Sequence, residues 1–213
     1  MIDKAVIFDL DGTLWDATEQ VAESWEIVLR KYVDPTIVFT AANAKELMGL
    51  TMEEIGRRLS ADWFDEETKA RFIDECFSYE VEYLASHPGR LFEKEIETLQ
   101  KLKESGYSLF IVSNCQKGYI ENFLPLMPKG LFSGILCHGD TNLSKGKTIL
   151  ALMAKHEIKE GVYVGDTAGD ETATREAGLP FIHAAYGFGK AEALGESIEA
   201  IVDLPDALHS LGF

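Results

Sequence analysis

Several features that mark whole classes of protein are scarce or missing in this sequence. Only three cysteines occur among its 213 residues, at Cys76, Cys115 and Cys137, and they match neither zinc nor haem spacing. No apolar run approaches the roughly 18 residues that span a bilayer, and the chain has no low-complexity tract or fixed-period repeat. We therefore expect a globular protein with reduced thiols in the cytoplasm.

Positive charge is also scarce. The 20 Lys and Arg residues face 36 Asp and Glu residues, which gives a formal net charge of −16, and no run of basic residues interrupts this balance. Such a chain repels phosphate backbones and anionic lipid headgroups. The sequence therefore disfavours nucleic acid and membranes as partners, and it leaves the oligomeric state open.

Short apolar runs alternate with helical patterns along most of the chain. Continuous apolar runs predict strands buried on both faces of a sheet, and they lie at residues 4–9, 108–113, 134–137, 161–165 and 180–184. Between them, apolar residues at helical spacing predict helices over residues 94–105, 117–126, 147–156 and 171–177. This alternation predicts an α/β fold, a Rossmann-like parallel sheet covered by helices on both faces.

One long connection breaks the alternation. Residues 16–88 contain helical patterns and no convincing strand, so we expect an inserted all-helical domain there, between the two parts of an α/β core at residues 1–15 and 89–213. Asp16 with Glu19, and Thr51 with Glu54, resemble the capping boxes that begin helices, and the last helix is expected to begin near Asp65.

Polar residues follow the predicted strands where each strand ends. In a parallel sheet, ligands collect beyond the carboxyl ends of the strands. The residues expected at this edge are four aspartates, a serine and a lysine before a helix: Asp9, Asp11, Ser113, Lys145, Asp166 and Asp170. This set is typical of a phosphoryl-transfer site that uses a metal ion.

The aspartates are the reason for expecting the metal. Two like charges about 4 Å apart repel by roughly 4 kcal/mol at an effective dielectric constant near 20, which corresponds to about three pKa units. Without compensation, the cluster would take up protons. Mg²⁺, a hard ion that takes oxygen ligands, suits this set.

These same motifs resemble the haloacid dehalogenase-like (HAD) phosphatase superfamily. The resemblance covers the whole chain, in family order, and the helical insert resembles the C1 cap of phosphoglycolate phosphatase-like members. The matching segments are Phe8-Asp9-Leu10-Asp11-Gly12-Thr13-Leu14, Val112-Ser113-Asn114, a downstream lysine, and Gly165-Asp166 with Asp170.

The resemblance implies a role for each matched residue. Asp9 would attack phosphorus and form an aspartyl-phosphate, and Asp11 would be the general acid and base. The expected phosphate- and substrate-binding residues are Gly12, which permits the turn and exposes backbone N–H groups, Thr13, Ser113, Asn114 and Lys145. Mg²⁺ would be held by Asp9, the Asp11 carbonyl and Asp166, with Asp170 either a direct ligand or an acceptor behind the ligands.

The sequence leaves several alternatives open. Lys147 lies two residues from Lys145 and could replace it. The predicted activity is Mg²⁺-dependent hydrolysis of a small phosphorylated metabolite, with a phosphomutase of the β-phosphoglucomutase type as the alternative. A phospho-aspartate receiver uses similar residues, but it needs no helical insert.

Residues of the insert can be interpreted either as selecting the substrate or as packing in the core. The turn Met48-Gly49-Leu50-Thr51 is expected to present a specificity loop, as a C1 cap commonly does. We expect Trp25, Met48, Met52, Phe72 and Phe77 to pack in the core of the insert because they lie at helical spacing.

Overall fold

The computed structural model describes residue 2 and residues 4–191 and 195–213. Its centre is a six-stranded parallel sheet in the order β5-β4-β1-β6-β7-β8. The strands are β1 (Ala5–Phe8), β4 (Ser108–Ser113), β5 (Phe132–Cys137), β6 (Gly161–Gly165), β7 (Phe181–Ala184) and β8 (Glu196–Ile198). Because β1 lies between β4 and β6, the loop after it meets the loops after both neighbours at one edge.

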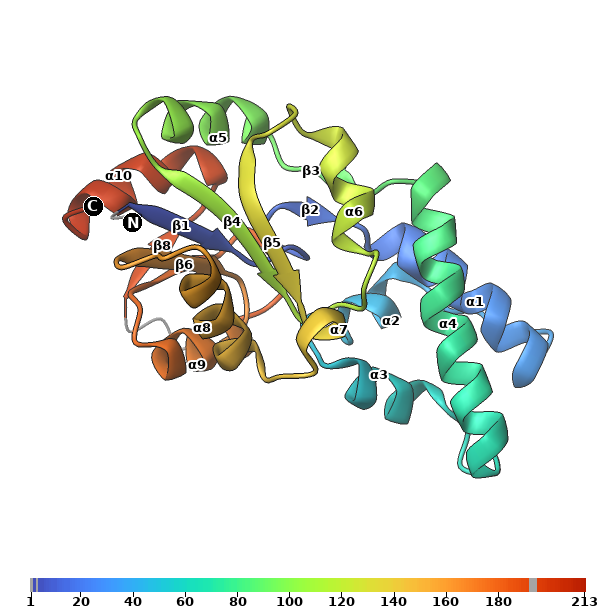
Figure 1. The fold of residues 1–213 in the computed structure, drawn as a ribbon. Coiled ribbons are helices and arrows are strands. Elements are labelled where there is room, and N and C mark those ends of the chain that lie inside the picture. Colours follow the sequence, from blue (N-terminus) through green and yellow to red (C-terminus); the bar gives the residue numbers. More distant parts are fainter. Residues whose placement is uncertain (1, 3, 192–194) are drawn as a thin grey trace.

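Helices cover both faces of the sheet, as the predicted fold class requires (Figure 1). Alternate side chains of a strand point to opposite faces, so Val6 and Phe8 pack in one apolar cluster and Ala5 and Ile7 in another. The helices outside the insert are α5 (Glu95–Glu104), α6 (Ile120–Phe123), α7 (His138–Thr141), α8 (Lys145–Lys155), α9 (Ala168–Ala177) and α10 (Leu204–Ser210). The first cluster includes residues of α5 and α10, and the second includes residues of α8 and α9.

Residues 16–88 form a helical segment beyond the carboxyl ends of β4 and β5 (Figure 1); we call it the cap segment. A short antiparallel pair, β2 (Trp15–Asp16) and β3 (Arg90–Leu91), joins the chain where it leaves and re-enters the sheet region. The helices of the cap segment are α1 (Thr18–Tyr32), α2 (Ala41–Lys45), α3 (Met52–Leu59) and α4 (Glu66–Ser86).

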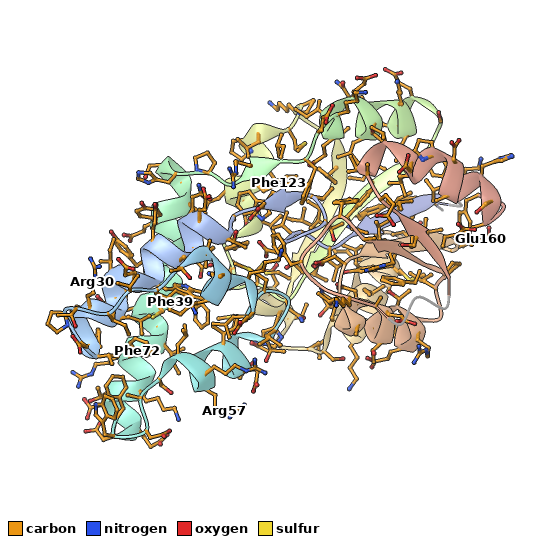
Figure 2. The ribbon with its side chains drawn as sticks, turned by 180° about the vertical axis from the view of Figure 1, so that it is seen from behind. Arg30, Phe39, Arg57, Phe72, Phe123 and Glu160 are labelled. Atoms are coloured by element: carbon orange, nitrogen blue, oxygen red, sulfur yellow. The ribbon has the colours of Figure 1, made fainter. Side chains whose placement is uncertain are left out.

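Aromatic side chains hold the cap segment together. The rings of Trp25 on α1 and Phe77 on α4 meet edge to face with centroids 6.4 Å apart, and Phe39 lies 6.0 Å from Trp25. Farther from the sheet, Phe72 packs against Tyr32 at 5.5 Å. Figure 2 labels Phe39 and Phe72 in this region, well away from the sheet. Apolar burial between α1 and α4 therefore stabilises the cap segment, and the same apolar cluster continues into one face of the sheet.

The helix starts in the cap segment agree only in part with the sequence. Thr51 and Asp65 cap α3 and α4 by accepting hydrogen bonds from the backbone N–H groups of Glu54 and Thr68. The predicted box at Asp16 is wrong, because Asp16 belongs to β2 and its carboxylate accepts from the N–H and hydroxyl of Thr18.

Other boundaries differ for local reasons. The helix expected over residues 117–126 is a short α6 followed by a 3₁₀ turn at Leu124–Leu126, because Gly118 has a φ of +92° and Pro125 lies in the turn. Strand β8 and the β2–β3 pair are too short to leave a pattern in the sequence. A second 3₁₀ turn, Ile201–Asp203, precedes α10. No helix in the described ranges is long and apolar enough to cross a membrane.

Candidate active site

Three predicted residues from three parts of the chain form a buried charged cluster at the end of β1. The Nζ atom of Lys145 donates to Oδ1 of Asp9 at 2.8 Å and to Oδ1 of Asp170 at 2.5 Å. All three side chains are at least 95% buried. The structure therefore brings together a candidate nucleophile, a cation and a second acid that are separated by up to 161 residues in sequence.

Lys145, and not Lys147, provides this cation. Ser144 caps α8, so Lys145 is the first residue of the helix and its side chain reaches the cluster. Lys147 is exposed, and its backbone N–H donates to the Ser144 hydroxyl. Burial lowers the pKa of Lys145, but the carboxylates of Asp170 and Asp9 outweigh burial and hold that pKa well above its usual value. The amine therefore stays charged in the site.

Asp166 completes the acid cluster. Its Oδ2 accepts from the backbone N–H groups of Phe188 at 2.7 Å and Gly189 at 3.0 Å. Its Oδ1 is buried and has no hydrogen-bond partner among the described residues. An orphaned buried carboxylate oxygen is costly unless something binds it. Asp166 therefore keeps one oxygen available for a ligand.

The donor set fits a divalent cation. Asp9, Asp166 and Asp170 each offer a carboxylate oxygen, and these oxygens lie within 4.8 Å of one another. Burial, together with the charge of Asp170, raises the pKa of Asp9 well above its usual value and that of Asp166 to about 6. A bound cation would reverse this trend and keep the carboxylates ionised.

Asp170 uses both of its oxygens within the protein. Oδ1 accepts from Lys145, and Oδ2 accepts from the backbone N–H and the hydroxyl of Thr167, the residue that caps α9. These contacts fix Asp170 as the residue that orients Lys145. A direct bond from Asp170 to a metal would compete with them.

Gly12 permits the turn after β1, as the sequence predicts. Its φ of +77° favours glycine, and a Cβ at this position would lie 2.4 Å from Oδ2 of Asp166. Its own N–H donates to the Trp15 carbonyl at 2.9 Å, so it is used inside the loop. The N–H groups that the turn is expected to expose to phosphate are therefore those of other residues, which stays a prediction, and Gly12 itself allows the close approach of the loop to Asp166.

Asp11 lies apart from the acid cluster. Its Oδ1 accepts from Nε1 of Trp15 at 2.9 Å and from the hydroxyl of Tyr119 at 2.7 Å. Burial raises the pKa of Asp11 to about 6, although both hydrogen bonds oppose the change. A carboxyl group with a pKa this close to neutrality can both give and take a proton. Sequence reasoning did not find either partner, and Tyr119 lies in a segment without any motif.

The remaining predicted residues lie around the same edge. The Ser113 hydroxyl is buried and accepts from the N–H of Cys115 at 3.3 Å. Asn114 donates through Nδ2 to the Gly49 carbonyl at 2.9 Å. Thr13 is fully buried, and its hydroxyl finds no partner within the described ranges. Asn114 therefore ties the sheet edge to the cap segment.

A pocket lies between the sheet edge and the cap segment. Asp9 and Asp11 line one side, and the turn at Met48, Gly49 and Leu50 lines the other. The turn is thus placed where the sequence predicts a specificity loop. Of the five residues expected to pack in the core of the insert, Phe72 is fully buried. The other four also line the pocket: Trp25, Met48, Met52 and Phe77.

Glu80 is a polar residue of this pocket that the sequence only hinted at. It interrupts the apolar stripe of α4, and its Oε2 accepts from Nε1 of Trp25 at 3.1 Å and from Nε2 of Gln116 at 2.8 Å. Only 3% of Glu80 is exposed, and burial raises its pKa to about 8. The side chain is therefore mostly a neutral carboxylic acid at pH 7.

Comparison with known proteins identifies the family. A family model of the haloacid dehalogenase-like hydrolases matches residues 6–184. The chain belongs to this family. The match confirms the predicted enzyme class, a HAD-like phosphatase hydrolase, and the predicted fold of the family.

Curated relatives and solved structures agree with this assignment. A phosphoglycolate phosphatase of Pseudomonas syringae pv. tomato is 26% identical over 212 residues, which cover 94% of this chain and 76% of that protein. One from Vibrio vulnificus is 28% identical over 207 residues, with coverages of 91% and 89%. The crystal structure of a predicted phosphoglycolate phosphatase from Haemophilus somnus superposes with a TM-score of 0.82 at 22% identity, over 96% of this chain and 97% of that one.

Proposed function

We propose that this HAD-like hydrolase is a Mg²⁺-dependent phosphatase that cleaves a small phosphorylated metabolite through an aspartyl-phosphate on Asp9. The main support for this proposal is the contact of Lys145 with both Asp9 and Asp170, beside an Asp166 oxygen that has no partner among the described residues. This arrangement supplies a nucleophile and positive charge at one point. The names of the curated relatives, phosphoglycolate phosphatases, support a small substrate.

In the first step, an Asp9 oxygen attacks phosphorus while the bond from phosphorus to the leaving oxygen breaks. Asp11 gives its proton to the leaving oxygen, so the alcohol departs neutral. Lys145, held by Asp170, interacts with the charge of the phosphoryl group. The hydrogen bonds from Trp15 and Tyr119 hold Asp11 before this step, and we propose that substrate binding turns its carboxyl toward the leaving oxygen.

In the second step, water attacks the phosphorus of the aspartyl-phosphate. Asp11, now ionised, takes the proton from water, inorganic phosphate leaves, and Asp9 is regenerated. Ser113, Asn114 and Thr13 would hold phosphoryl oxygens during both steps. Mg²⁺ bound by Asp9, Asp166 and the Asp11 carbonyl would keep the carboxylates ionised and neutralise phosphoryl charge. Asp170 would orient Lys145 behind these ligands.

We further propose that residues 16–88 act as a cap that covers the reaction site and excludes water. Polar contacts that cross the pocket, among them Asn114 to Gly49 and Gln116 to Glu80, support this division. The three cysteines are free thiols, which suits a reducing cytoplasm. The phosphomutase alternative is not favoured, because the curated relatives reported above are named as phosphatases.

Replacing the nucleophile tests the proposal. We expect Asp9→Asn to reduce phosphate release from p-nitrophenyl phosphate with Mg²⁺ by at least about 10⁴-fold. Circular dichroism should show an intact fold, because the amide is the same size and relieves repulsion among buried acids. Retained turnover in a folded variant would remove Asp9 from its role. A single equivalent of phosphate taken up per wild-type chain without turnover would point to a receiver.

A further inference from the structure

The pocket that faces the leaving group is lined by acids and by no basic residue. Fifteen residues line it; Asp9, Asp11 and Glu80 are acids, and none of the fifteen is Lys, Arg or His. The rest are polar neutral residues near the sheet edge and mainly apolar residues from the cap segment. A phosphate group meets Lys145 on the sheet side, but whatever is attached to that phosphate meets no cation in this lining.

Several cations lie near the pocket without lining it. Lys145 is held by Asp9 and Asp170 on the sheet side. On α3, Arg57 and Arg58 both bind Glu54 at 2.8 Å, and their side chains are 66% and 45% exposed. Lys45 on α2 is exposed and lies over the ring of Phe188. Lys69 and Lys117 line neighbouring pockets that share Met52 and Phe77 with this one. An anionic leaving group would therefore find no cation among the fifteen residues that line this pocket.

Glu80 has one oxygen committed and one available. Oε2 accepts from Trp25 and Gln116, and these contacts fix the carboxyl group at the junction of α1, α4 and the loop after β4. Oε1 has no hydrogen bond among the described residues and is not among the fully buried orphan atoms. Because Glu80 also lines the pocket, we infer that this oxygen is available to a leaving group bound there.

We propose that the pocket selects phosphate esters of uncharged, hydroxyl-bearing alcohols over esters that carry a carboxylate, and that Glu80 is the residue that contacts a hydroxyl of the leaving group. This proposal rests on the proposed phosphatase function and names its substrate class. It separates this chain from its phosphoglycolate phosphatase relatives, since a glycolate leaving group is an anion.

The physical reason is the free-energy cost of an unpaired buried charge. A carboxylate enclosed beside three acids and apolar walls loses its hydration and gains no ion pair, so binding it is unfavourable. A hydroxyl can both donate and accept, so it can pair with the neutral or the ionised form of Glu80. A site built to hydrogen-bond a hydroxyl also discriminates against substrates that lack one, because its polar groups are then left unpaired.

Two substrates with the same three-carbon skeleton test the charge selection. Glycerol 3-phosphate and 3-phosphoglycerate differ by a hydroxymethyl group in place of a carboxylate. We expect kcat/KM for glycerol 3-phosphate to be at least about tenfold higher with the full-length wild-type chain and Mg²⁺. Equal values, or a preference for 3-phosphoglycerate, would overturn the proposal.

Variants at two positions then identify the residues responsible. Propyl phosphate, which has no free hydroxyl, is the reference for Glu80. The ratio of kcat/KM for glycerol 3-phosphate to that for propyl phosphate should fall by about tenfold in Glu80→Leu, and by less than about threefold in Glu80→Gln, which keeps a hydrogen-bonding group. An unchanged ratio in a folded Glu80→Leu variant would overturn the assignment of Glu80.

If Glu80→Leu does not fold, a cation added to the pocket provides a second test of the charge argument. Met52 lines the pocket and is partly exposed, so Met52→Lys can place an ammonium there, with Met52→Gln as the uncharged control of similar length. The ratio of kcat/KM for 3-phosphoglycerate to that for glycerol 3-phosphate should be at least about tenfold higher in Met52→Lys than in Met52→Gln. Equal ratios in the two variants would overturn the charge argument.

Hydrolysis of p-nitrophenyl phosphate separates the two proposals. If the wild-type chain hydrolyses it but shows no preference between the three-carbon substrates, only the substrate class is wrong. If the folded chain hydrolyses none of these esters with Mg²⁺, the proposed phosphatase function is wrong as well.

Discussion

The sheet side and the cap side of the pocket are held in different ways. On the sheet side, Asp9, Lys145 and Asp170 are almost completely buried and joined by charged hydrogen bonds. On the cap side, Met48, Leu50 and Met52 are half-buried, and they are connected to the sheet edge through a few polar contacts. Charged and buried contacts fix geometry to a fraction of an ångström, whereas a turn of partly exposed apolar side chains can adjust.

We infer that the sheet side carries out the chemistry and the cap side selects the leaving group. Bond-breaking chemistry needs a fixed nucleophile and cation, which the end of β1 and the first turns of α8 and α9 provide. Selection of the leaving group needs a surface that can vary without moving the nucleophile, and the cap segment provides it. The predictions below test whether the two sides are in fact separable.

After the loss of the nucleophile itself, the largest effect should come from the cation on the sheet side. Lys145→Ala removes the positive charge beside Asp9, and we expect kcat/KM to fall by about 10² to 10³-fold. Lys147→Ala is the matched control, because this lysine is exposed two residues away, and its kcat/KM should stay within about twofold of wild type. Steady-state kinetics with p-nitrophenyl phosphate measures kcat/KM of both variants. Equal losses would contradict the assignment of Lys145 as the lysine of the site.

A smaller effect should follow from changing the proposed metal ligand. Asp166→Asn keeps an oxygen that can accept from Phe188 and Gly189 but removes a negative charge. We expect the Mg²⁺ concentration at half-maximal activity to rise by about 10 to 100-fold. An unchanged Mg²⁺ titration would remove Asp166 from the ligand set, and a matching change in a cap variant such as Met52→Gln would show that the two sides are not separable.

A buried acid outside the site, Glu95, should make the free energy of unfolding depend on pH. Glu95 on α5 is 1% exposed, and burial raises its pKa from 4.5 to about 8. Between these values the folded chain holds a proton that the unfolded chain does not. This contribution to stability is therefore complete below about pH 4.5 and is lost as the pH rises through about 8.

Glu95→Gln should remove that contribution to the pH dependence. The amide keeps an acceptor for the N–H of Phe92. Between pH 5 and 9 the wild-type chain should lose unfolding free energy on the order of 1 to 3 kcal/mol through Glu95, and the variant should not show this loss. Urea unfolding across this pH range measures the effect. Glu97→Gln is the control on the same helix, since Glu97 is exposed, and a flattened profile in that variant would contradict the assignment to Glu95.

The smallest effect should come from the turn of the cap segment. Gly49 has a φ of +78°, and a Cβ there would lie 3.2 Å from Cγ2 of Thr167. We expect Gly49→Ala to lower the free energy of unfolding by about 1 kcal/mol and to raise KM for p-nitrophenyl phosphate more than it changes kcat. A fall in kcat with no change in KM would show that the turn acts on the nucleophile's side of the pocket.

Sequence reasoning succeeded wherever a short segment carries its own signal. Continuous apolar runs predicted five of the six strands of the sheet, and the polar residues after β1, β4 and β6 predicted the edge at which the acids meet. The sixth strand, β8, has three residues and owes its strand conformation to pairing with β7. Elements this short depend on their neighbours more than on their own residues.

Contacts between distant segments were not predictable in this way. Tyr119 donates to Asp11 across 108 residues, and Gln116 donates to Glu80 across 36. Neither donor belongs to a motif. The first contact depends on how the start of α6 faces the loop after β1, and the second on how the loop after β4 faces α4. Only the polar interruption of an apolar helix stripe at Glu80 was visible as a signal.

The sequence by itself determined which residues could carry phosphoryl transfer, because the end of a buried strand is a local property of the chain. The tertiary structure decided which lysine reaches Asp9, how Asp11 is held, and that the pocket wall contains acids and no cation among its fifteen lining residues. The first two properties depend on how α8 and the start of α6 pack beside the loop after β1, and the third depends on how the cap segment packs against the sheet edge. The local sequence of each element leaves that packing open.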